Sequence, residues 1–193
     1  MLELQLEENE KKMKEQAEVS RVKAAMEADR QDQSCRRDNV VIHGILEVEN
    51  EKREDLLEKV IFLCASIDVN ANSENIGEVH RVGRIGARPR PLVVKTNNLT
   101  KMKIMSNKRK LKGRAQRHHD KIVIYEDLTE SRRRLREAAM RSKDVDFCFS
   151  RDGSITCKMT NGSWAEVNNS DDLLKVGVEG EDLDHAKYYG GLA

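Results

Sequence analysis

The hydrophobic positions of the first thirty residues are spaced as on one face of a helix. There is no glycine or proline between Leu2 and Arg30. Spacings of three, four or seven separate the members of this face: Leu2, Leu6, Met13, Ala17, Ser20 and Ala24. Asn9 and Gln16 stand where a strict heptad would be apolar, so residues 1–33 are predicted to form a helical stalk or the end of a weak coiled coil. The alternative is a solvated helix that packs against nothing.

Residues 36–127 alternate between strand and helix patterns. Short β-rich runs predict strands at 40–45, 76–82, 92–96 and 121–125. Helical spacing predicts a first helix through Leu56, Val60, Leu63, Cys64 and Ile67, and a second over 99–111 with Leu99, Met102 and Met105 turned inward. The order β-α-β-β-α-β is that of a split βαβ sandwich, which RNA-recognition domains share. We therefore predict an α+β fold with an atypical RRM-like βαββαβ sandwich.

Residues 128–178 predict a small second domain, made of one helix and a β-meander. Thr129 can cap a basic helix. The pairs Asp152-Gly153 and Asn161-Gly162 are type I′ hairpin signals that separate three short strands. Counting outward from these turns places Cys148 opposite Cys157 and Met159 opposite Trp164. Residues 179–193 are predicted to be an acidic flexible tail.

The charge of the chain is strongly segregated, although the formal net charge is only +1. Between His80 and Lys143 there are 20 Lys or Arg residues against 5 Asp or Glu, whereas the segments on both sides are acidic. Fields act locally, so distant acidic residues do not cancel this excess. A polyanion is the partner that such a stretch predicts. The low aromatic content of 4% and the 36% of charged residues indicate a modest core.

The cysteines and the chain start point to a reducing compartment. Cys35, Cys64, Cys148 and Cys157 include neither a CxxC pair nor a close Cys/His cluster, so we expect free thiols and no zinc site. The first residues have no apolar core of a signal peptide, and no run is long enough to span a membrane. We expect an intracellular protein with no membrane partner, in the cytoplasm or alternatively the nucleus.

No arrangement of side chains in the sequence is specific for catalysis. The histidines are scattered and belong to no HExxH, GxSxG or Walker motif: His43, His80, His118, His119 and His185. His118 and His119 could form half of a metal site, but adjacent side chains point apart, and a solvated basic loop is favoured. We therefore predict a protein that is not an enzyme and that holds no metal or cofactor.

Basic residues gather in three groups that we expect to bind nucleic acid. The first group lies at and between the second and third strands, the second group ends the second helix and leads to the fourth strand, and the third group begins the next helix. In order, they are Arg81, Arg84, Arg88 and Arg90, then Lys108, Arg109, Lys110, Lys112, Arg114 and Arg117, then Arg132, Arg133, Arg134 and Arg136. Converging on one cleft, they would track a phosphate backbone. The alternative is that they only solvate helix faces.

We expect the predicted sandwich to recognise bases only weakly. Its first and third strands, VVIHGI and LVVKT, contain no Phe, Tyr or Trp on which a base could stack. Tyr125, at the end of the fourth strand, is the one candidate, although an edge tyrosine is more often structural. Binding should therefore depend on phosphate contacts, tolerate any sequence and weaken with salt.

Several segments, taken in order, resemble a known family. They are RRDNVVIHGILE, IGEVHRVGRIGARPRPLVVK, NKRKLKG, IVIYEDLT and RDGSITCKMTNGSWAEVNNSDDLLKVGV. Together they are similar to first-open-reading-frame proteins of LINE-type (non-LTR) retrotransposons, and to the carboxy-terminal domain of the baculovirus few-polyhedra (FP) protein. The resemblance covers Arg36 to Val178. No polymerase or nuclease motif accompanies it.

The resemblance implies a function in transposition. Such proteins join an oligomerising coiled coil, often trimeric, to an RNA-recognition domain and a small carboxy-terminal domain. They bind single-stranded RNA and act as nucleic-acid chaperones in the retrotransposon ribonucleoprotein. Their nucleic-acid-binding positions match Arg36, Arg37, Arg84, Arg88, Arg90, Lys108, Arg109 and Lys110 of this sequence.

Three classes of function remain open. The leading one is a chaperone that binds single-stranded RNA or DNA and associates with itself through the stalk. The second is a coiled-coil structural or adaptor protein whose basic domain binds an acidic protein partner. The third, a small enzyme, needs a cleft with perturbed titratable groups, which the sequence does not indicate.

Overall fold

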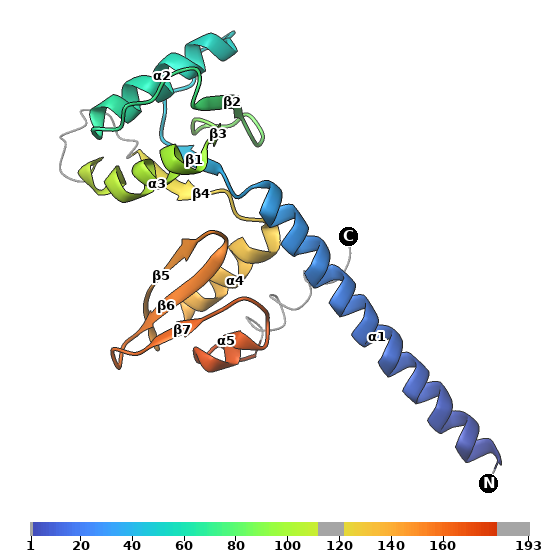
Figure 1. Ribbon diagram of the computed structural model, residues 1–193. Helices are drawn as coiled ribbons and strands as arrows, with labels where there is room; N and C mark the ends of the chain where they lie inside the picture. The colour runs from blue at the N-terminus through green and yellow to red at the C-terminus, as the bar shows by residue number, and fades with distance from the viewer. Residues whose placement is uncertain (1, 112–121, 181–193) are drawn as a thin grey trace. The chain divides into compact units, whose positions relative to one another are not determined.

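The computed structural model describes residues 2–111 and 122–180 and divides the chain into two compact units (Figure 1). One unit is continuous, Arg36–Asp127, and the other combines Met1–Cys35 with Leu128–Ala193. Both units mix helices with antiparallel strands, which confirms the α+β class. Within the described residues, no helix has the length and apolar character that a membrane span requires.

The continuous unit contains the predicted order of strands and helices. Its elements are β1 (Asn39–His43), α2 (Arg53–Ser66), β2 (Ile76–Arg81), β3 (Leu92–Thr96), α3 (Asn98–Asn107), the 3₁₀ helix η1 (Lys108–Leu111) and β4 (Val123–Glu126). The strands form one antiparallel sheet in the order β2-β3-β1-β4. The connection between β1 and the neighbouring β3 therefore contains α2 and β2, and α3 connects β3 to the other edge of the sheet.

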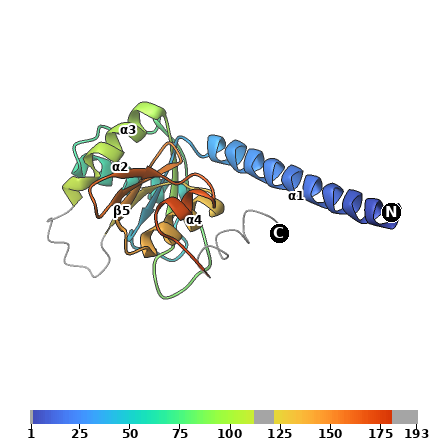
Figure 2. The ribbon, with the colours of Figure 1, turned by 90° about the horizontal axis from the view of Figure 1, so that it is seen from below.

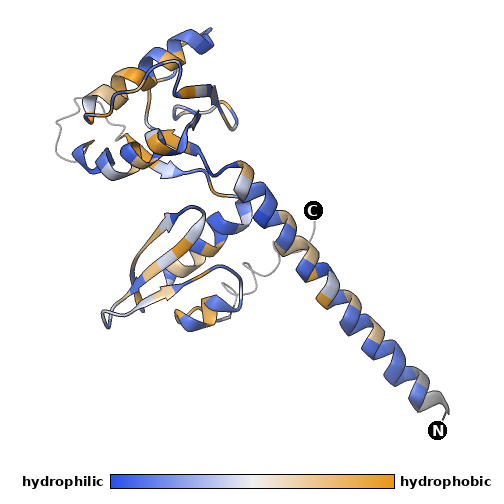
Figure 3. Cartoon of the chain, viewed as in Figure 1, coloured by the Kyte–Doolittle hydropathy of each residue, from blue (hydrophilic) through white to orange (hydrophobic). Residues whose placement is uncertain are grey.

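The core of this unit lies between the two helices and one face of the sheet. Val40 and Ile42 alternate with the outward Val41 on β1, as a strand with one covered face requires. Val60 of α2 and Ile104 of α3 are completely buried against them. Figure 3 shows orange, hydrophobic segments on α2 and on the strands of this unit, between blue, hydrophilic ones.

The prediction for the inward face of α3 is wrong in two positions. Leu99 and Met102 are exposed, and only Met105 packs partly against the core. The buried positions are Thr100, Lys101 and Ile104. Asn97 caps the helix by accepting a hydrogen bond from the Thr100 amide, and this start turns a different face inward. The buried Lys101 ammonium is satisfied by Glu126 at 2.8 Å and by the Arg37 carbonyl at 2.6 Å, which a hydrophobicity pattern does not reveal.

The N-terminal helix α1 (Leu2–Cys35) is uninterrupted and ends two residues beyond the predicted stalk, residues 1–33 (Figures 1 and 2). Its last turns are held by the second part of its own unit. The buried Gln33 side chain accepts a 2.9 Å hydrogen bond from the Thr129 amide, and Asp29 accepts one of 2.8 Å from Arg132. These contacts continue the helix through a polar segment that the apolar pattern alone does not support.

The rest of this unit is the predicted helix and β-meander. Its elements are α4 (Glu130–Arg141), β5 (Val145–Arg151), β6 (Ser154–Met159), β7 (Trp164–Glu166) and α5 (Asp172–Lys175), and the sheet order is β5-β6-β7. Thr129 caps α4 as predicted, since its hydroxyl accepts from the Arg132 amide. Leu135 and Ala139 of α4 pack with Ile155 of β6 and Leu173 of α5 in a second core.

The two predicted hairpin turns differ in length. The Asp152-Gly153 turn is confirmed: both residues have positive φ, and Arg151 pairs with Ser154. The prediction for Asn161-Gly162 is wrong by one residue, because Lys158, not Met159, lies opposite Trp164. Residues 160–162 form a three-residue loop with Gly162 at φ 87°, closed by a hydrogen bond from the Met159 amide to the Ser163 carbonyl.

The predicted cross-strand pair of cysteines is confirmed, but the expectation of free thiols is wrong for it. Cys148 and Cys157 lie opposite each other with Cα atoms 4.1 Å apart and form a disulfide on the covered face of the sheet. Narrow antiparallel pairs bring two Cβ atoms within reach of such a bond. Cys35 and Cys64 are free, and burial raises the pKa of the Cys64 thiol to about 11.

Candidate nucleic-acid interface

One face of the four-stranded sheet is free of its helices and carries a row of outward positions, of which Val93 is itself buried. The register aligns His80 with Val93, Val93 with Val41, and Val41 with Tyr125, so the row crosses all four strands. Tyr125 is exposed and meets His43 edge to face, with ring centroids 5.7 Å apart. Burial lowers the pKa of His43, so this imidazole is neutral near pH 7 and adds no charge to the face.

Two of the four arginines in the first basic group, Arg81 and Arg90, bind groups of their own unit. The Arg81 side chain is only 4% exposed. Its guanidinium donates to both carboxylate oxygens of Glu51 and to the carbonyls of Ile45, Leu46 and Arg90. Arg90 binds Glu47 through its Nε at 2.8 Å and its backbone amide at 3.0 Å. These hydrogen bonds lower the pKa of Glu47 to about 2, so the pair is ionised at neutral pH.

The other two arginines of this group are presented to solvent. Arg84 and Arg88 are exposed in the connection between β2 and β3, residues 82–91. Gly83, at φ 92°, starts this connection in a conformation that other residues rarely adopt. The arginines are therefore carried at the β2 edge of the sheet, on a loop anchored by the Arg81 and Arg90 contacts.

The second basic group begins at the opposite edge of the sheet. Lys108 donates to the Ile124 carbonyl of β4 at 3.0 Å, and its ammonium lies 6.0 Å from the centre of the Tyr125 ring. Arg109 is exposed, and Lys110 forms a solvent-exposed ion pair with Asp68 at 2.9 Å. The predicted residues Lys112, Arg114 and Arg117, like the His118-His119 pair, lie outside the described residues.

The sheet register separates these two groups by its full width. Arg81, Leu92, Ile42 and Ile124 stand in one row across the four strands. Neighbouring strands are about 4.8 Å apart, so the two edges are about 14 Å apart. The exposed cations of the β2–β3 loop and of η1 therefore flank the free face instead of forming one cluster.

Arg36 and Arg37 lie just before β1, at the other end of the sheet. Arg36 pairs with Asp127 at 3.3 Å and remains partly exposed. Arg37 is exposed, and its carbonyl accepts the hydrogen bond from buried Lys101. The start of β1 pairs with the ends of β3 and β4, so these arginines are separated along the strands from the β2–β3 loop.

The third basic group belongs to the other unit and is largely engaged there. Arg132 binds Asp29 and donates to the Gly153 carbonyl at 2.8 Å. Arg133 and Arg134 both pair with Glu130, one and the same carboxylate on the first turn of α4. Arg136 also has a partner. The predicted convergence of all three groups on one cleft remains a prediction.

The structure adds an aromatic surface that the sequence reasoning missed. Phe147, Phe149 and Trp164 are all exposed on the outer face of the β5-β6-β7 sheet. The signal was present in the alternation of Phe147, Cys148 and Phe149, which places both phenylalanines on one face.

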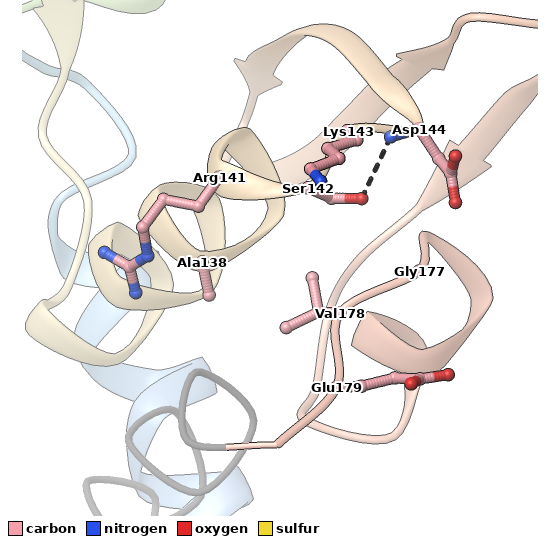
Figure 4. A pocket seen from close by; sticks show the side chains of 8 residues that line it. All are labelled: Ala138, Arg141, Ser142, Lys143, Asp144, Gly177, Val178 and Glu179. Atoms are coloured by element: carbon pink, nitrogen blue, oxygen red, sulfur yellow. Dashed lines mark hydrogen bonds between the residues drawn. The ribbon is translucent and has the colours of Figure 1, made fainter.

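A shallow hollow in the same unit has no arrangement typical of an active site. Its volume is about 370 Å³, and it lies between the end of α4 and residues 177–179 (Figure 4). Arg141 and Lys143 on its rim are balanced by Asp144 and Glu179, and the Ser142 hydroxyl accepts a hydrogen bond from the Asp144 amide. Within the described parts of the chain, no three His, Cys, Asp or Glu side chains gather as a metal site would require.

No protein-family model matches this chain, and no curated protein matches it. The function is therefore inferred from the residues and their arrangement.

Proposed function

We propose that the protein binds single-stranded nucleic acid, with RNA as the natural ligand, mainly through the phosphate backbone. The observation that carries the proposal is the placement of exposed cations on both sides of the free sheet face. The exposed Arg84 and Arg88 stand at one edge, and the exposed Arg109, next to the half-buried Lys108, at the other. A single strand laid across the sheet would meet positive charge on entering and on leaving the face.

The topology of the unit supports this proposal. The β-α-β-β-α-β order, with both helices on one face and the sequence β2-β3-β1-β4 across the sheet, is an arrangement that RNA-recognition domains use. In this RRM-like unit the free face is poor in aromatic rings, since Tyr125 is the one aromatic residue other than histidine on the described strands. Phosphate contacts would then supply most of the affinity, with little preference for sequence.

Weak discrimination between sequences also suits a nucleic-acid chaperone. A protein that holds strands through salt-dependent phosphate contacts can shift along them and exchange between them. The resemblance to the LINE-type first-open-reading-frame proteins gives this activity a setting, the ribonucleoprotein of a retrotransposon. The alternative, an adaptor with an acidic protein partner, uses the same cations and is distinguished by the experiment below.

The test is the salt dependence of binding to a fluorescently labelled single-stranded RNA, measured by anisotropy in wild type and in an Arg84→Glu, Arg88→Glu variant. Each lost phosphate contact should reduce the slope of log affinity against log salt by about 0.7. The variant should bind all sequences more weakly and with a flatter slope. The same is expected of Arg109→Glu combined with Lys110→Glu.

A matched control carries the same change of charge on the covered side of the unit. Lys52 and Lys103 are exposed at the start of α2 and on α3, away from the free face. A Lys52→Glu, Lys103→Glu variant should retain most of the affinity and the slope. If the Arg84 and Arg88 reversals leave both quantities unchanged, the proposal is wrong, and loss of an acidic protein partner instead would favour the adaptor.

A further inference from the structure

The outer face of the β5-β6-β7 sheet exposes three large aromatic rings beside one another. The side chains of Phe147, Phe149 and Trp164 are 44%, 37% and 56% exposed. The indole meets the Phe147 ring at 5.8 Å and the Phe149 ring at 5.9 Å, in both cases edge to face. The rings thus support one another across the sheet and form a surface of defined geometry.

These rings are not part of the core of their unit. The covered face of the same strands carries Ile155 and the Cys148–Cys157 disulfide, which are buried against α4 and α5. The disulfide joins β5 to β6 between the flanking phenylalanines, and so fixes the register of the strands that carry the rings. The strands that carry the aromatic surface are therefore packed on one face against α4 and α5, and the rings on the other face are exposed.

A cation lies within the aromatic surface. Lys158 occupies the middle strand between Phe147 and Trp164, in one row across the sheet, and its ammonium is 6.0 Å from the centre of the Phe147 ring. The next row places Thr156 between Phe149 and Glu166. Lysine is depleted in the centres of protein interfaces, whereas aromatic rings with an adjacent cation are the usual means of holding a base and its phosphate.

We propose that Phe147, Phe149 and Trp164 form a stacking site for the bases of a single-stranded nucleic acid, with Lys158 near the adjoining phosphate. This inference rests on the proposed function and deepens it. The unit 36–127 offers cations but few rings, and the β5-β6-β7 sheet offers rings with few cations. Stacking tolerates any sequence because every base has a π face, so the site does not require base-specific recognition.

The protein contains a single tryptophan, which makes the site directly observable. Titration of the full chain with an oligothymidylate should quench and shift the fluorescence of Trp164, because a base would lie against the indole. An abasic oligomer of the same length and charge should still bind through its phosphates, measured by anisotropy, and should leave the fluorescence nearly unchanged. This measurement needs no substitution and so no assumption about folding.

Substitutions supply the second arm of the test. Trp164→Leu and Phe147→Leu keep an apolar side chain but remove the ring, and each should weaken oligothymidylate binding about tenfold, within the range known for loss of one stacked base. Affinity for the abasic oligomer should not change. Trp164→Phe keeps a ring and should retain most of the affinity. Circular dichroism checks that each variant is folded.

The outcomes separate this site from the general function. If oligothymidylate binds with a normal salt dependence, but the fluorescence and the affinities of the leucine variants are unchanged, the stacking site is wrong and the phosphate interface stands. If neither oligomer binds at low salt, both proposals are wrong. Equal quenching by the abasic oligomer would also overturn stacking, because it would show that the signal does not come from bases.

Discussion

Arg81 and Arg84 carry the same charge three residues apart but have opposite roles in the structure. Arg81 is buried against Glu51. Burial alone would raise the pKa of the Glu51 carboxyl, but the hydrogen bonds from Arg81 and Lys59 outweigh this effect, so the pKa is lowered. Removing Arg81 would leave the buried Glu51 with Lys59 as its remaining cation and three carbonyls without this donor, and loss of a partner from a buried pair costs about 3–5 kcal/mol. We therefore expect Arg81→Ala to lower the free energy of unfolding by that amount in urea denaturation.

Arg84→Ala is the matched control, since its side chain is exposed in the loop that follows. Surface substitutions of this kind change stability by about 0.5 kcal/mol or less. Equal urea midpoints for the two variants would contradict the structural role of Arg81. In binding assays the order should reverse, with Arg84 the residue that contributes to affinity.

Glu47 should make stability depend on pH in an acidic window. Hydrogen bonds from Arg90 lower the pKa of its carboxyl from 4.5 to about 2 in the folded chain. The folded state therefore favours the ionised form, and the stabilisation is complete above pH 4.5 and is lost as the pH falls towards 2. Thermal unfolding of Glu47→Gln should give a lower Tm than wild type at pH 7, and the difference should shrink across this window. A constant difference down to pH 2 would rule out the carboxylate as its cause.

The sequence predicted the cations but not their division into structural and exposed ones. Net charge by segment located the basic stretch between His80 and Lys143 because counting needs no structure. The partners that remove Arg81 and Arg90 from solvent, Glu51 and Glu47, lie about 30 to 43 residues away in an acidic segment. Nothing local distinguishes these arginines from Arg84, so their roles depend on tertiary packing.

At the level of elements, the last turns of α1 belong to the unit completed by α4 and the β-meander. Gln33 is buried and accepts from the Thr129 amide, at the N-cap of α4. Gln33→Ala would leave that amide without its acceptor, at a cost of about 1–3 kcal/mol. The control is Gln31→Ala, whose side chain only reaches the exposed Glu27. Urea unfolding monitored by Trp164 fluorescence should separate the two variants, and equal midpoints would contradict this contact.

The disulfide should stabilise the meander. It joins two cysteines that are nine positions apart in the sequence. A cross-link of this length lowers the conformational entropy of the unfolded chain, which stabilises the folded state by about 2–3 kcal/mol. Reductant should therefore lower the Tm of the wild type. A Cys148→Ala, Cys157→Ala variant should unfold at the lower temperature already and should not respond to reductant. If reductant lowers both proteins equally, the effect does not arise from this bond.

Local turn chemistry predicted the register of one hairpin and missed that of the next. Asp152-Gly153 and Asn161-Gly162 carry the same signal, but only the first forms a two-residue loop. In the second, Thr160 also leaves the ladder, and Trp164 pairs with Lys158. Packing of the core sets the length of this loop, because Met159 and Val167 must both face inward. A dipeptide signal locates a turn, and the facing strands set its length.

For the molecule as a whole, self-association through α1 is expected to be weak. Val19, Val22 and Met26 are exposed at helical spacing, but charged and polar residues together occupy most of the helix. A few apolar contacts hardly offset the entropy lost when chains associate. Analytical ultracentrifugation at low micromolar concentration should find mostly monomer. A tight oligomer would show that the stalk, or the folded units, contribute more than this stripe.

The ion pair between Arg36 and Asp127 brings together the first and last residues of the continuous unit. That unit is thus nested in the other one, as an insertion whose two ends meet. During synthesis, α1 leaves the ribosome before the insertion, but Thr129 and Arg132, which hold its last turns, follow only after the whole insertion. The nested unit can fold on the growing chain before the partners of α1 have been made, so a helix that precedes the insertion is anchored only after it.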